Sequence, residues 1–252
     1  VEENMPTILI ENRENIAVLT LNNGVANAIN PELVQNLSDA LDQIRNDAKG
    51  IVLCGGEKFF SIGLDLPVVI NFSRKEMSEF WFEFNCLLLD LCTISLPTVC
   101  ALTGHAVAGG NILALTGDLR FADSDTKKIG MNEIKLGVPV PYLADMMLRQ
   151  VVGERSATQM ICGGEFMVFS DAEKIGLIDK IFVPGTLVRK AVEKTVEISE
   201  LQAHAFSAVK SNRTEEIKTR FENNREAKHE MFLDCWFNEG TRRLLQAASQ
   251  KF

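Results

Sequence analysis

The sequence lacks the features that mark membrane-spanning, exported and nucleic-acid-binding proteins. No segment approaches the roughly 18 uninterrupted apolar residues that a membrane-spanning helix needs. The first residues, VEENMPTILIE, show neither a basic start nor a hydrophobic signal stretch, which predicts a cytoplasmic location. Lys and Arg number 26 against 34 Asp and Glu, so the net charge of -8 opposes binding to nucleic acid. We therefore expect neither a membrane nor a nucleic acid as a partner.

Metal and disulfide signatures are also missing. The six cysteines show no CxxC spacing and mostly sit in apolar runs, which predicts buried free thiols in a reducing compartment. His229 and Glu230 begin an HExxH-like pattern, but position 233 is Leu, so the second zinc ligand is absent. The three histidines are better explained as structural or surface residues than as ligands. We expect no metal site.

The signatures of serine hydrolases and of common nucleotide-binding loops are absent as well. In GGEKFFSIG the residue two positions before Ser61 is Phe59, so the G-x-S-x-G nucleophile motif is not formed. The chain has no G-x-x-x-x-G-K-[ST] loop, and AVAGG lacks the G-x-G-x-x-G spacing of a dinucleotide-binding turn. What remains in these two stretches is a pair of glycine turns.

The pattern of apolar and turn residues predicts a repeating unit of two strands followed by a helix. The chain of 252 residues is 46% hydrophobic, enough to bury the core of one large domain or two small ones. The repeating order differs from the strict strand and helix alternation of a doubly wound sheet. The expected strands cover 7–11, 15–22, 50–56, 58–63, 97–104, 118–124 and 127–132, and the expected helices cover 31–47, 74–92 and 109–117.

From about Pro141 onward the pattern becomes almost wholly helical. A helical pattern covers 187–210, followed by a charged helix through Glu230, and 176–184 is the single expected strand in this half. The last 22 residues concentrate bulky apolar side chains. These are Phe232, Trp236, Phe237, Leu244 and Leu245. Such a terminal segment either docks back over the core or covers another subunit, and the sequence leaves both placements open.

The two glycine turns lie in the same context, each at the end of an apolar strand and shortly before a helix. Gly63 follows FFSI, and Gly109 and Gly110 follow HAVA. Glycine at such a turn often only tolerates a positive φ or close packing. Two turns together can also direct backbone N–H groups at one point, where they stabilise a developing oxyanion. One turn alone is better explained structurally, and it is the recurrence of the same context that favours an oxyanion hole.

Four motifs taken in order carry a resemblance to a known family. VANAIN, FFSIGLDL, GHAVAGGNILAL and IGMNEIKLGVPVP resemble the enoyl-CoA hydratase/isomerase, or crotonase, family over Thr7 to Val183. The resemblance implies an α/β spiral of ββα repeats over residues 1–195 and a C-terminal helical trimerisation region over 196–252. It also implies a homotrimer or a dimer of trimers that binds acyl-CoA and acts in fatty acid metabolism.

The resemblance assigns residues around the two turns. The two oxyanion-hole donors correspond to the backbone N–H groups of Leu64 and Gly109. The groove for coenzyme A corresponds to the segment that contains Lys58, Phe60, Ile62, Asp65 and Leu66. Lys58 is equally well explained as a phosphate contact or as a solvated loop lysine. Ile62 departs from the smaller residue more usual at its position, which affects the fit of the nucleotide.

A single carboxylate distinguishes this chain from the hydratases it resembles. The hydratases use two glutamates, whose positions here are Ile112 and Glu133. The resemblance therefore implies Glu133 as the catalytic acid and base, with Ile112 on the wall of the substrate site. One carboxylate suffices to move a double bond, and the segment 130–142 also resembles the Δ3,Δ2-enoyl-CoA isomerase branch. We expect an isomerase that needs no metal and no nucleotide cofactor, coenzyme A being part of the substrate.

Other functions stay open from the sequence. Relatives that lack one or both glutamates include decarboxylases, hydrolases and dehalogenases, and Asn111, Asn132, His105 or Tyr142 could serve such chemistry. Hydration of an enoyl-CoA is a further alternative. A non-catalytic acyl-CoA-binding subunit belongs to a different class, and the retained glycines and glutamate oppose it.

Overall fold

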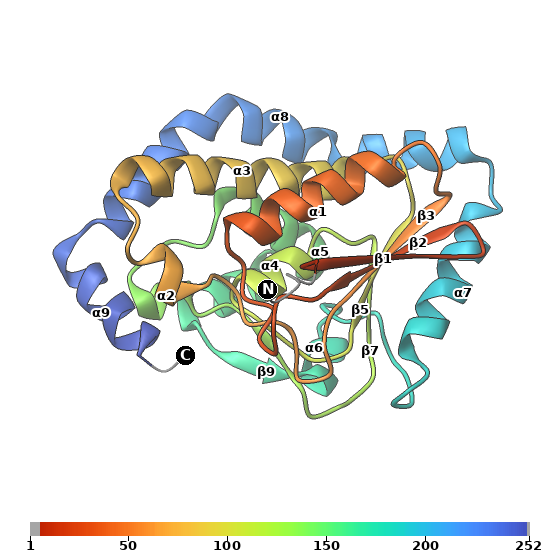
Figure 1. Cartoon of the computed structure of the whole chain (residues 1–252), viewed down its shortest axis with the longest axis horizontal. Coiled ribbons are helices and arrows are strands. Elements are labelled where there is room, and N and C mark those ends of the chain that lie inside the picture. The colour runs from red at the N-terminus through yellow and green to blue at the C-terminus, as the bar shows by residue number, and fades with distance from the viewer. Residues whose placement is uncertain (1–5, 251–252) are drawn as a thin grey trace, which may run out of the picture.

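The computed structural model describes residues 6–250 and has an α/β fold with two sheets and an extensive layer of helices (Figure 1). The strands are β1 Ile8–Arg13, β2 Ile16–Leu21, β3 Gly50–Cys54, β4 Phe59–Ser61, β5 Thr98–Leu102, β6 His105–Val107, β7 Leu119–Ala122, β8 Lys128–Gly130, β9 Phe166–Val168 and β10 Lys180–Ile181. The helices are α1 Pro31–Ile44, α2 Leu66–Val69, α3 Arg74–Thr93, α4 Gly109–Ala114, the 3-10 helix η1 Glu133–Leu136, α5 Tyr142–Gly163, α6 Phe169–Lys174, α7 Leu187–Ser199, α8 Ala203–Trp236 and α9 Glu239–Ser249.

The strands form a large and a small sheet. The large sheet has the order β1-β2-β3-β5-β7-β10, and its strands are parallel except for the antiparallel pair β1 and β2. The small sheet has the order β4-β6-β8-β9, in which β4, β6 and β8 are parallel and β9 is antiparallel to β8. Three strands of the small sheet therefore end at the same edge.

Successive strands alternate between the two sheets, and this alternation produces the spiral. β3, β5 and β7 enter the large sheet, while β4, β6 and β8, which follow each of them, enter the small sheet. A helix comes after each pair before the chain returns to the large sheet. This confirms the predicted spiral of ββα repeats, and it explains why the sequence shows two strands before each helix.

Local sequence signals fix the first helices. Asn30 caps α1 by accepting a hydrogen bond from the backbone N–H of Leu33 at 2.9 Å, and Pro31 occupies the first turn, where no N–H is needed. Ser73 and Glu76 form a reciprocal capping box at the start of α3. The observed starts of both helices match the starts expected from the sequence.

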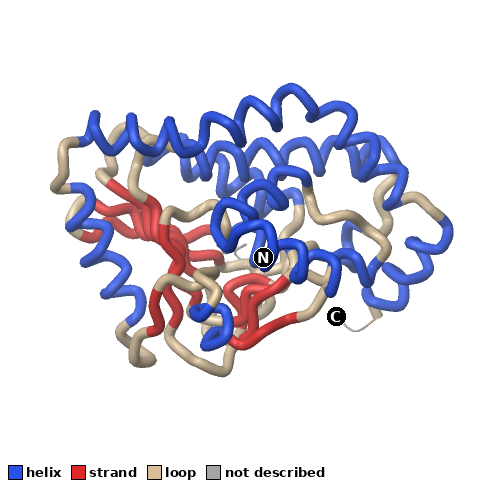
Figure 2. Tube along the Cα trace, turned by 180° about the vertical axis from the view of Figure 1, so that it is seen from behind, coloured by secondary structure: helices blue, strands red, loops and turns tan. Residues whose placement is uncertain are grey.

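The large sheet separates two apolar layers because neighbouring residues of a strand face opposite sides. In β3, Val52 belongs to the layer that includes Ala191 and Val192 of α7, whereas Ile51 and Leu53 belong to the main core. Figure 1 shows α7 on one side of this sheet and α1 and α3 on the other, and Figure 2 shows the same division from behind. This double burial explains why the inner strands are continuous apolar runs rather than alternating patterns.

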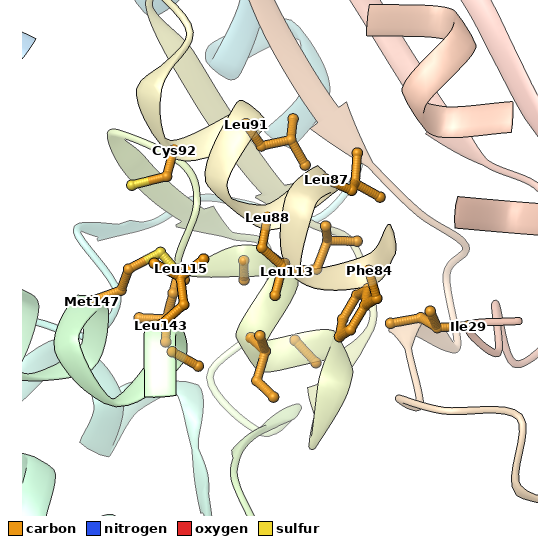
Figure 3. Packing of buried hydrophobic residues seen from close by; sticks show 14 of the residues in the cluster. Ile29, Phe84, Leu87, Leu88, Leu91, Cys92, Leu113, Leu115, Leu143 and Met147 are labelled. Atoms are coloured by element: carbon orange, nitrogen blue, oxygen red, sulfur yellow. The ribbon is translucent and has the colours of Figure 1, made fainter. Parts of the chain in front are cut away.

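The short helix α4 lies inside the main core. All six of its residues are buried, and its Leu113, together with Leu115 just after the helix, packs between longer helices. Figure 3 shows Leu113 beside Leu88 of α3, and Leu115 beside Leu143 of α5. This close packing fixes the N-terminal end of α4, where the second glycine turn lies.

Two expectations about the second half of the chain are wrong. β9 was not expected, because three residues carry no periodic signal and the strand exists through pairing with β8. The predicted continuous helix over 187–210 is broken, since α7 ends at Ser199 and α8 begins at Ala203. The remaining expected strand of this half is present as the two-residue β10, at the edge of the large sheet.

The C-terminal helices dock on the core of their own chain. α8 runs along α3, and the buried Nζ of Lys210 lies 2.9 Å from a carboxylate oxygen of Asp118. Near the other end of α8, Phe232 stacks on Trp81 with ring centroids 3.6 Å apart. α9 then contacts α2. The sequence left two placements open for the C-terminal segment, and within this chain the segment docks over the core.

Some predictions concern parts of the chain that the structure does not describe. Residues 1–5, which begin the stretch examined for a signal, lie outside the described residues, as do the outer ends of the predicted regions 1–195 and 196–252. The division into these two regions stays a prediction. Across residues 6–250, no helix combines the length and the apolar character that crossing a membrane requires.

Candidate active site

The predicted catalytic residues follow three neighbouring strands of the small sheet. Leu64 comes three residues after β4, Gly109 two residues after β6, and Glu133 three residues after β8. Since these strands are parallel and adjacent, their carboxyl ends lie at one edge. Ligands of α/β proteins commonly bind outside this edge. Sheet topology thus brings together three residues that are up to 69 positions apart.

A cavity of about 560 Å³ lies at this edge and extends toward the C-terminal helices. Its wall is mostly apolar, with a few polar groups, as is typical of small-molecule sites. The lining residues are Phe59, Ile62, Leu64, Leu66, Trp81, Phe84, His105, Val107, Ala108, Gly109, Ile112, Lys128, Asn132, Glu133, Leu136, Val138, Pro141, Phe166, Phe232, Trp236, Leu245 and Ala248.

The two glycine turns place two backbone N–H groups beside each other. A Cβ atom built on Gly109 would lie 3.4 Å from the backbone nitrogen of Leu64, so the two amides are neighbours. Within residues 6–250 neither N–H donates a hydrogen bond. Gly109 is also the first residue of α4, where backbone N–H groups have no partner within the helix. Both donors are therefore free to bind an oxygen atom in the cavity.

The first turn is held in place by the segment around Asn27. The hydroxyl of Ser61 donates to the carbonyl oxygen of Asn27 at 2.7 Å and accepts from the N–H of Gly63 at 3.1 Å. The N–H of Ile29 donates to the carbonyl oxygen of Gly63 at 2.8 Å. These bonds give the VANAIN motif a structural role, because they orient the turn that presents Leu64.

Glu133 is a buried carboxyl group with an incomplete set of hydrogen bonds. Its exposed fraction is 8%, and its Oε2 atom is buried without a hydrogen-bond partner among residues 6–250. Burial raises the pKa of Glu133 to about 7, although the backbone N–H groups of Glu133 and Asn132 act in the opposite direction. A carboxyl group with this pKa can both accept and donate a proton near neutral pH.

Ile112 supplies an apolar wall at the position that the sequence resemblance assigns to a second carboxylate. It lies in α4, lines the cavity and is 2% exposed. Of the described residues that line the cavity, Glu133 is the only one with a carboxyl group. The other titratable residues of the lining are His105 and Lys128, and burial together with the nearby lysines lowers the pKa of His105. The site therefore holds one candidate acid and base of the carboxyl type.

The residues assigned to the coenzyme A groove divide into two sets. Ile62 and Leu66 line the cavity together with Leu64. The other three do not. Lys58 is exposed, and its Nζ lies 5.8 Å from the centre of the Phe59 ring. Phe60 is fully buried in the main core. Asp65 caps α2, since its Oδ1 accepts from the N–H of Val68 at 3.3 Å.

The far end of the cavity carries none of the site residues predicted from the sequence. This helical end is formed by residues from α3, α8 and α9, namely Trp81, Phe84, Phe232, Trp236, Leu245 and Ala248. The aromatic C-terminal segment was visible in the sequence, but not the surface that it covers. Among the residues considered for alternative chemistry, His105 and Asn132 line the cavity, Tyr142 lines a neighbouring groove, and Asn111 is buried in α4.

Solved structures similar to this chain include both isomerases and hydratases. Human mitochondrial Δ3,Δ2-enoyl-CoA isomerase has a TM-score of 0.92 and 25% sequence identity, with 97% of each chain covered. The enoyl-CoA hydratase EchA3 of Mycobacterium ulcerans has a TM-score of 0.84 and 26% identity, with 90% of this chain and 99% of that chain covered. The two names describe different reactions, so the similarity fixes the fold and the family rather than the reaction.

Sequence comparison gives the same family. The short-chain-enoyl-CoA hydratase of Clostridium acetobutylicum is 28% identical over 190 residues, which cover 74% of this chain and 72% of that protein. The family model for enoyl-CoA hydratase/isomerase matches residues 11–247, which is nearly the whole described chain and includes every residue that lines the cavity except Ala248. The chain therefore belongs to the enoyl-CoA hydratase/isomerase family of enzymes and has the crotonase fold.

Proposed function

We propose that this protein is a Δ3,Δ2-enoyl-CoA isomerase in which Glu133 is the sole proton shuttle. The observation that carries the proposal is the pairing of one buried carboxyl group, Glu133, with an apolar Ile112 in a cavity that also holds two free backbone N–H groups. The high TM-score with the human mitochondrial isomerase supports it.

The proposed reaction moves a double bond from C3 to C2 of an acyl-CoA thioester. Ionised Glu133 takes a proton from C2, and the electrons shift onto the thioester oxygen to form a dienolate. The protonated carboxyl group then returns a proton at C4, and the thioester carbonyl reforms with the double bond between C2 and C3. The carboxyl group ends the cycle ionised, so no second acid or base is required.

The backbone N–H groups of Leu64 and Gly109 stabilise the oxygen of the dienolate in this scheme. Donors that are already oriented act without a cost of reorganisation when the charge forms. Removal of one such donor typically costs about 3 kcal/mol of transition-state stabilisation. Because the cavity wall is mostly apolar, this interaction is stronger than it would be in water.

Hydration of an enoyl-CoA places a different demand on the site. The enzyme must hold and deprotonate a water molecule while it protonates the substrate carbon, and two carboxylates are well suited to that work. Ile112 cannot bind water, and its burial keeps that part of the wall apolar. Hydratase activity remains the second candidate because the similar proteins from Mycobacterium ulcerans and Clostridium acetobutylicum carry that name.

The cavity lining near the first glycine turn supports a binding place for coenzyme A. Ile62 and Leu66 line the cavity near the first glycine turn, and Lys128 lines it from β8. Phe59 lines the cavity as well, and the Nζ atom of the exposed Lys58 lies 5.8 Å from the centre of the Phe59 ring. In our proposal the lysines contact phosphate groups and the apolar side chains contact the pantetheine arm. The reaction requires no metal ion and no nucleotide cofactor.

We also propose a homotrimer or a dimer of trimers, located in the cytoplasm. The C-terminal helices leave large apolar side chains exposed, with exposed fractions of 66% for Val209, 50% for Met231 and 47% for Leu244. In our proposal a second subunit covers these side chains. Sedimentation equilibrium should give three or six times the chain mass of 28.0 kDa, and a stable monomer at micromolar concentration would contradict the proposal.

The experiment that tests the function is the Glu133→Gln variant. Gln has nearly the same shape as Glu but cannot shuttle a proton, so the rate of isomerisation of a 3-enoyl-CoA should fall about 10²- to 10⁴-fold. Calorimetric titration with a saturated acyl-CoA should show that binding is retained. A variant that isomerises at the wild-type rate would remove Glu133 from the mechanism.

A further inference from the structure

One residue at the helical end of the cavity carries an unsatisfied hydrogen-bond donor. Trp236, the last residue of α8, lines the cavity and is 1% exposed. Its indole Nε1 is buried and has no hydrogen-bond partner among residues 6–250. A buried donor without an acceptor is uncommon in folded proteins, because the donor gives up water and gains nothing in return.

The surroundings of Trp236 are apolar and well packed. Its ring contacts that of Phe232 with centroids 5.7 Å apart, and Phe232 is itself stacked on Trp81. Phe84, which is 1% exposed, and Leu245, which is fully buried, also line the cavity at this end. An acyl chain that reaches this end therefore makes direct contact with the aromatic side chains.

A tryptophan at this position has a cost that an apolar aromatic residue would avoid. The indole N–H is a donor only, so it needs an oxygen or another acceptor. The helical end carries no ionised side chain among its described residues, so an acceptor that is itself charged would be buried without a counter-charge. An uncharged oxygen fits both requirements.

We infer that the indole N–H of Trp236 donates a hydrogen bond to an uncharged oxygen on the acyl chain, and that Trp236 selects acyl-CoA substrates with a hydroxyl or keto group remote from the thioester. The inference rests on the proposed function, because it takes the acyl chain to occupy this cavity. Trp236 is here a specificity-determining residue, and the proton shuttle at Glu133 is unchanged by it.

Nuclear magnetic resonance tests the hydrogen bond directly. The chain has only two tryptophans, so a protein labelled with ¹⁵N in the indole ring gives two signals, and Trp236→Phe identifies the signal of residue 236. The ligands are octanoyl-CoA and four octanoyl-CoAs with one hydroxyl at C5, C6, C7 or C8. They are saturated and are not isomerised. We expect the Trp236 indole proton to move downfield with at least one hydroxylated ligand and not with octanoyl-CoA.

Kinetics test the selectivity. The readout is the ratio of kcat/KM for a hydroxylated 3-octenoyl-CoA to kcat/KM for unsubstituted 3-octenoyl-CoA. Trp236→Phe should lower this ratio about tenfold, which corresponds to one neutral hydrogen bond. Phe84→Leu changes the volume of the same end without removing a donor, so it should leave the ratio unchanged even if both rates fall.

The outcomes separate this inference from the proposed function. If octanoyl-CoA binds and 3-octenoyl-CoA is isomerised, but no hydroxylated ligand shifts the Trp236 proton beyond octanoyl-CoA, the inference is wrong and the N–H has a structural or water-bound role. A ratio that Trp236→Phe leaves unchanged would overturn it equally. If octanoyl-CoA does not bind and 3-octenoyl-CoA is not isomerised, the proposed function fails instead.

Discussion

Gly63 and Gly109 approach each other so closely that neither position has room for a side chain. A Cβ atom on Gly63 would lie 2.8 Å from the backbone nitrogen of Gly109, and one on Gly109 would lie 3.0 Å from the Cα atom of Gly63. The two turns come from different strands of the small sheet. Their close approach is what places the N–H groups of Leu64 and Gly109 side by side.

Replacing Gly63 should therefore damage the site more than the fold. Gly63 has a φ of +98°, and a methyl group would press on the Gly109 nitrogen. We expect Gly63→Ala to lower kcat/KM for a 3-enoyl-CoA about 10²- to 10³-fold, the usual effect of losing one oxyanion-hole donor. The strained backbone should cost about 1–3 kcal/mol of stability, measured by urea unfolding.

Gly24→Ala is the matched control for backbone strain. Gly24 also has a positive φ, +63°, but a Cβ atom there would meet nothing within 4 Å. The Gly24→Ala variant should lose stability to an extent comparable with Gly63→Ala, and its kcat/KM should stay close to the wild-type value. Equal losses of activity in both variants would show that strain, rather than the disturbed N–H groups, explains the effect at Gly63.

The pKa of Glu133 sets the pH dependence of activity. Burial raises this pKa to about 7, and the carboxyl group must be ionised to take a proton from C2. The value of kcat/KM should thus rise tenfold per pH unit below about pH 7 and level off above it. A profile that is already flat from pH 5 to 8 would contradict the role of Glu133 as the base.

The same pKa predicts a pH-dependent stability difference between wild type and Glu133→Gln. The raised pKa means that the unfolded chain loses its proton near 4.5 while the folded chain keeps it until about 7. The wild type should therefore lose stability as the pH rises from about 4.5 to 7, by about 3 kcal/mol, relative to the variant. Urea unfolding of both proteins at pH 4.5 and 8 measures this difference, and a constant difference would contradict the burial argument.

Ile112→Glu should introduce hydration at a cost in stability. The new carboxyl group would stand on the cavity wall, at the position that the sequence resemblance assigns to the second glutamate of the hydratases. We expect 3-hydroxyacyl-CoA to form from a 2-enoyl-CoA, with a loss of about 3 kcal/mol in stability because a charge is buried without a partner. Ile112→Gln, which has the shape without the charge, should show no such gain. Hydration by both variants alike would mean that space, rather than a carboxylate, was missing.

The glycine turns and the carboxyl group that the structure brings together were recognisable in the sequence because each lies in a short local motif. Gly63, Gly109 and Glu133 each lie two or three residues after a strand, and parallel strands that enter one sheet end at one edge. The sequence could not show that Phe60 points into the core, because a three-residue strand has too few positions to reveal which face is buried.

The helical end of the cavity was not predictable for a different reason. Trp81 and Phe232 stack across 151 positions of sequence, and the contact depends on how α8 lies along α3. The sequence showed that the C-terminal segment is rich in aromatic residues but not which surface these residues cover. Tertiary packing also created β9, whose strand conformation comes from its pairing with β8.

The central claim is that one carboxyl group makes this protein an isomerase rather than a hydratase. The most direct measurement compares, for the wild type at pH 8, kcat/KM for the conversion of a 3-enoyl-CoA to the conjugated 2-enoyl-CoA with kcat/KM for the hydration of the 2-enoyl-CoA of the same chain length. We predict that isomerisation exceeds hydration by at least about 100-fold, since hydration lacks the second carboxylate. Hydration as fast as isomerisation, or faster, would contradict the account.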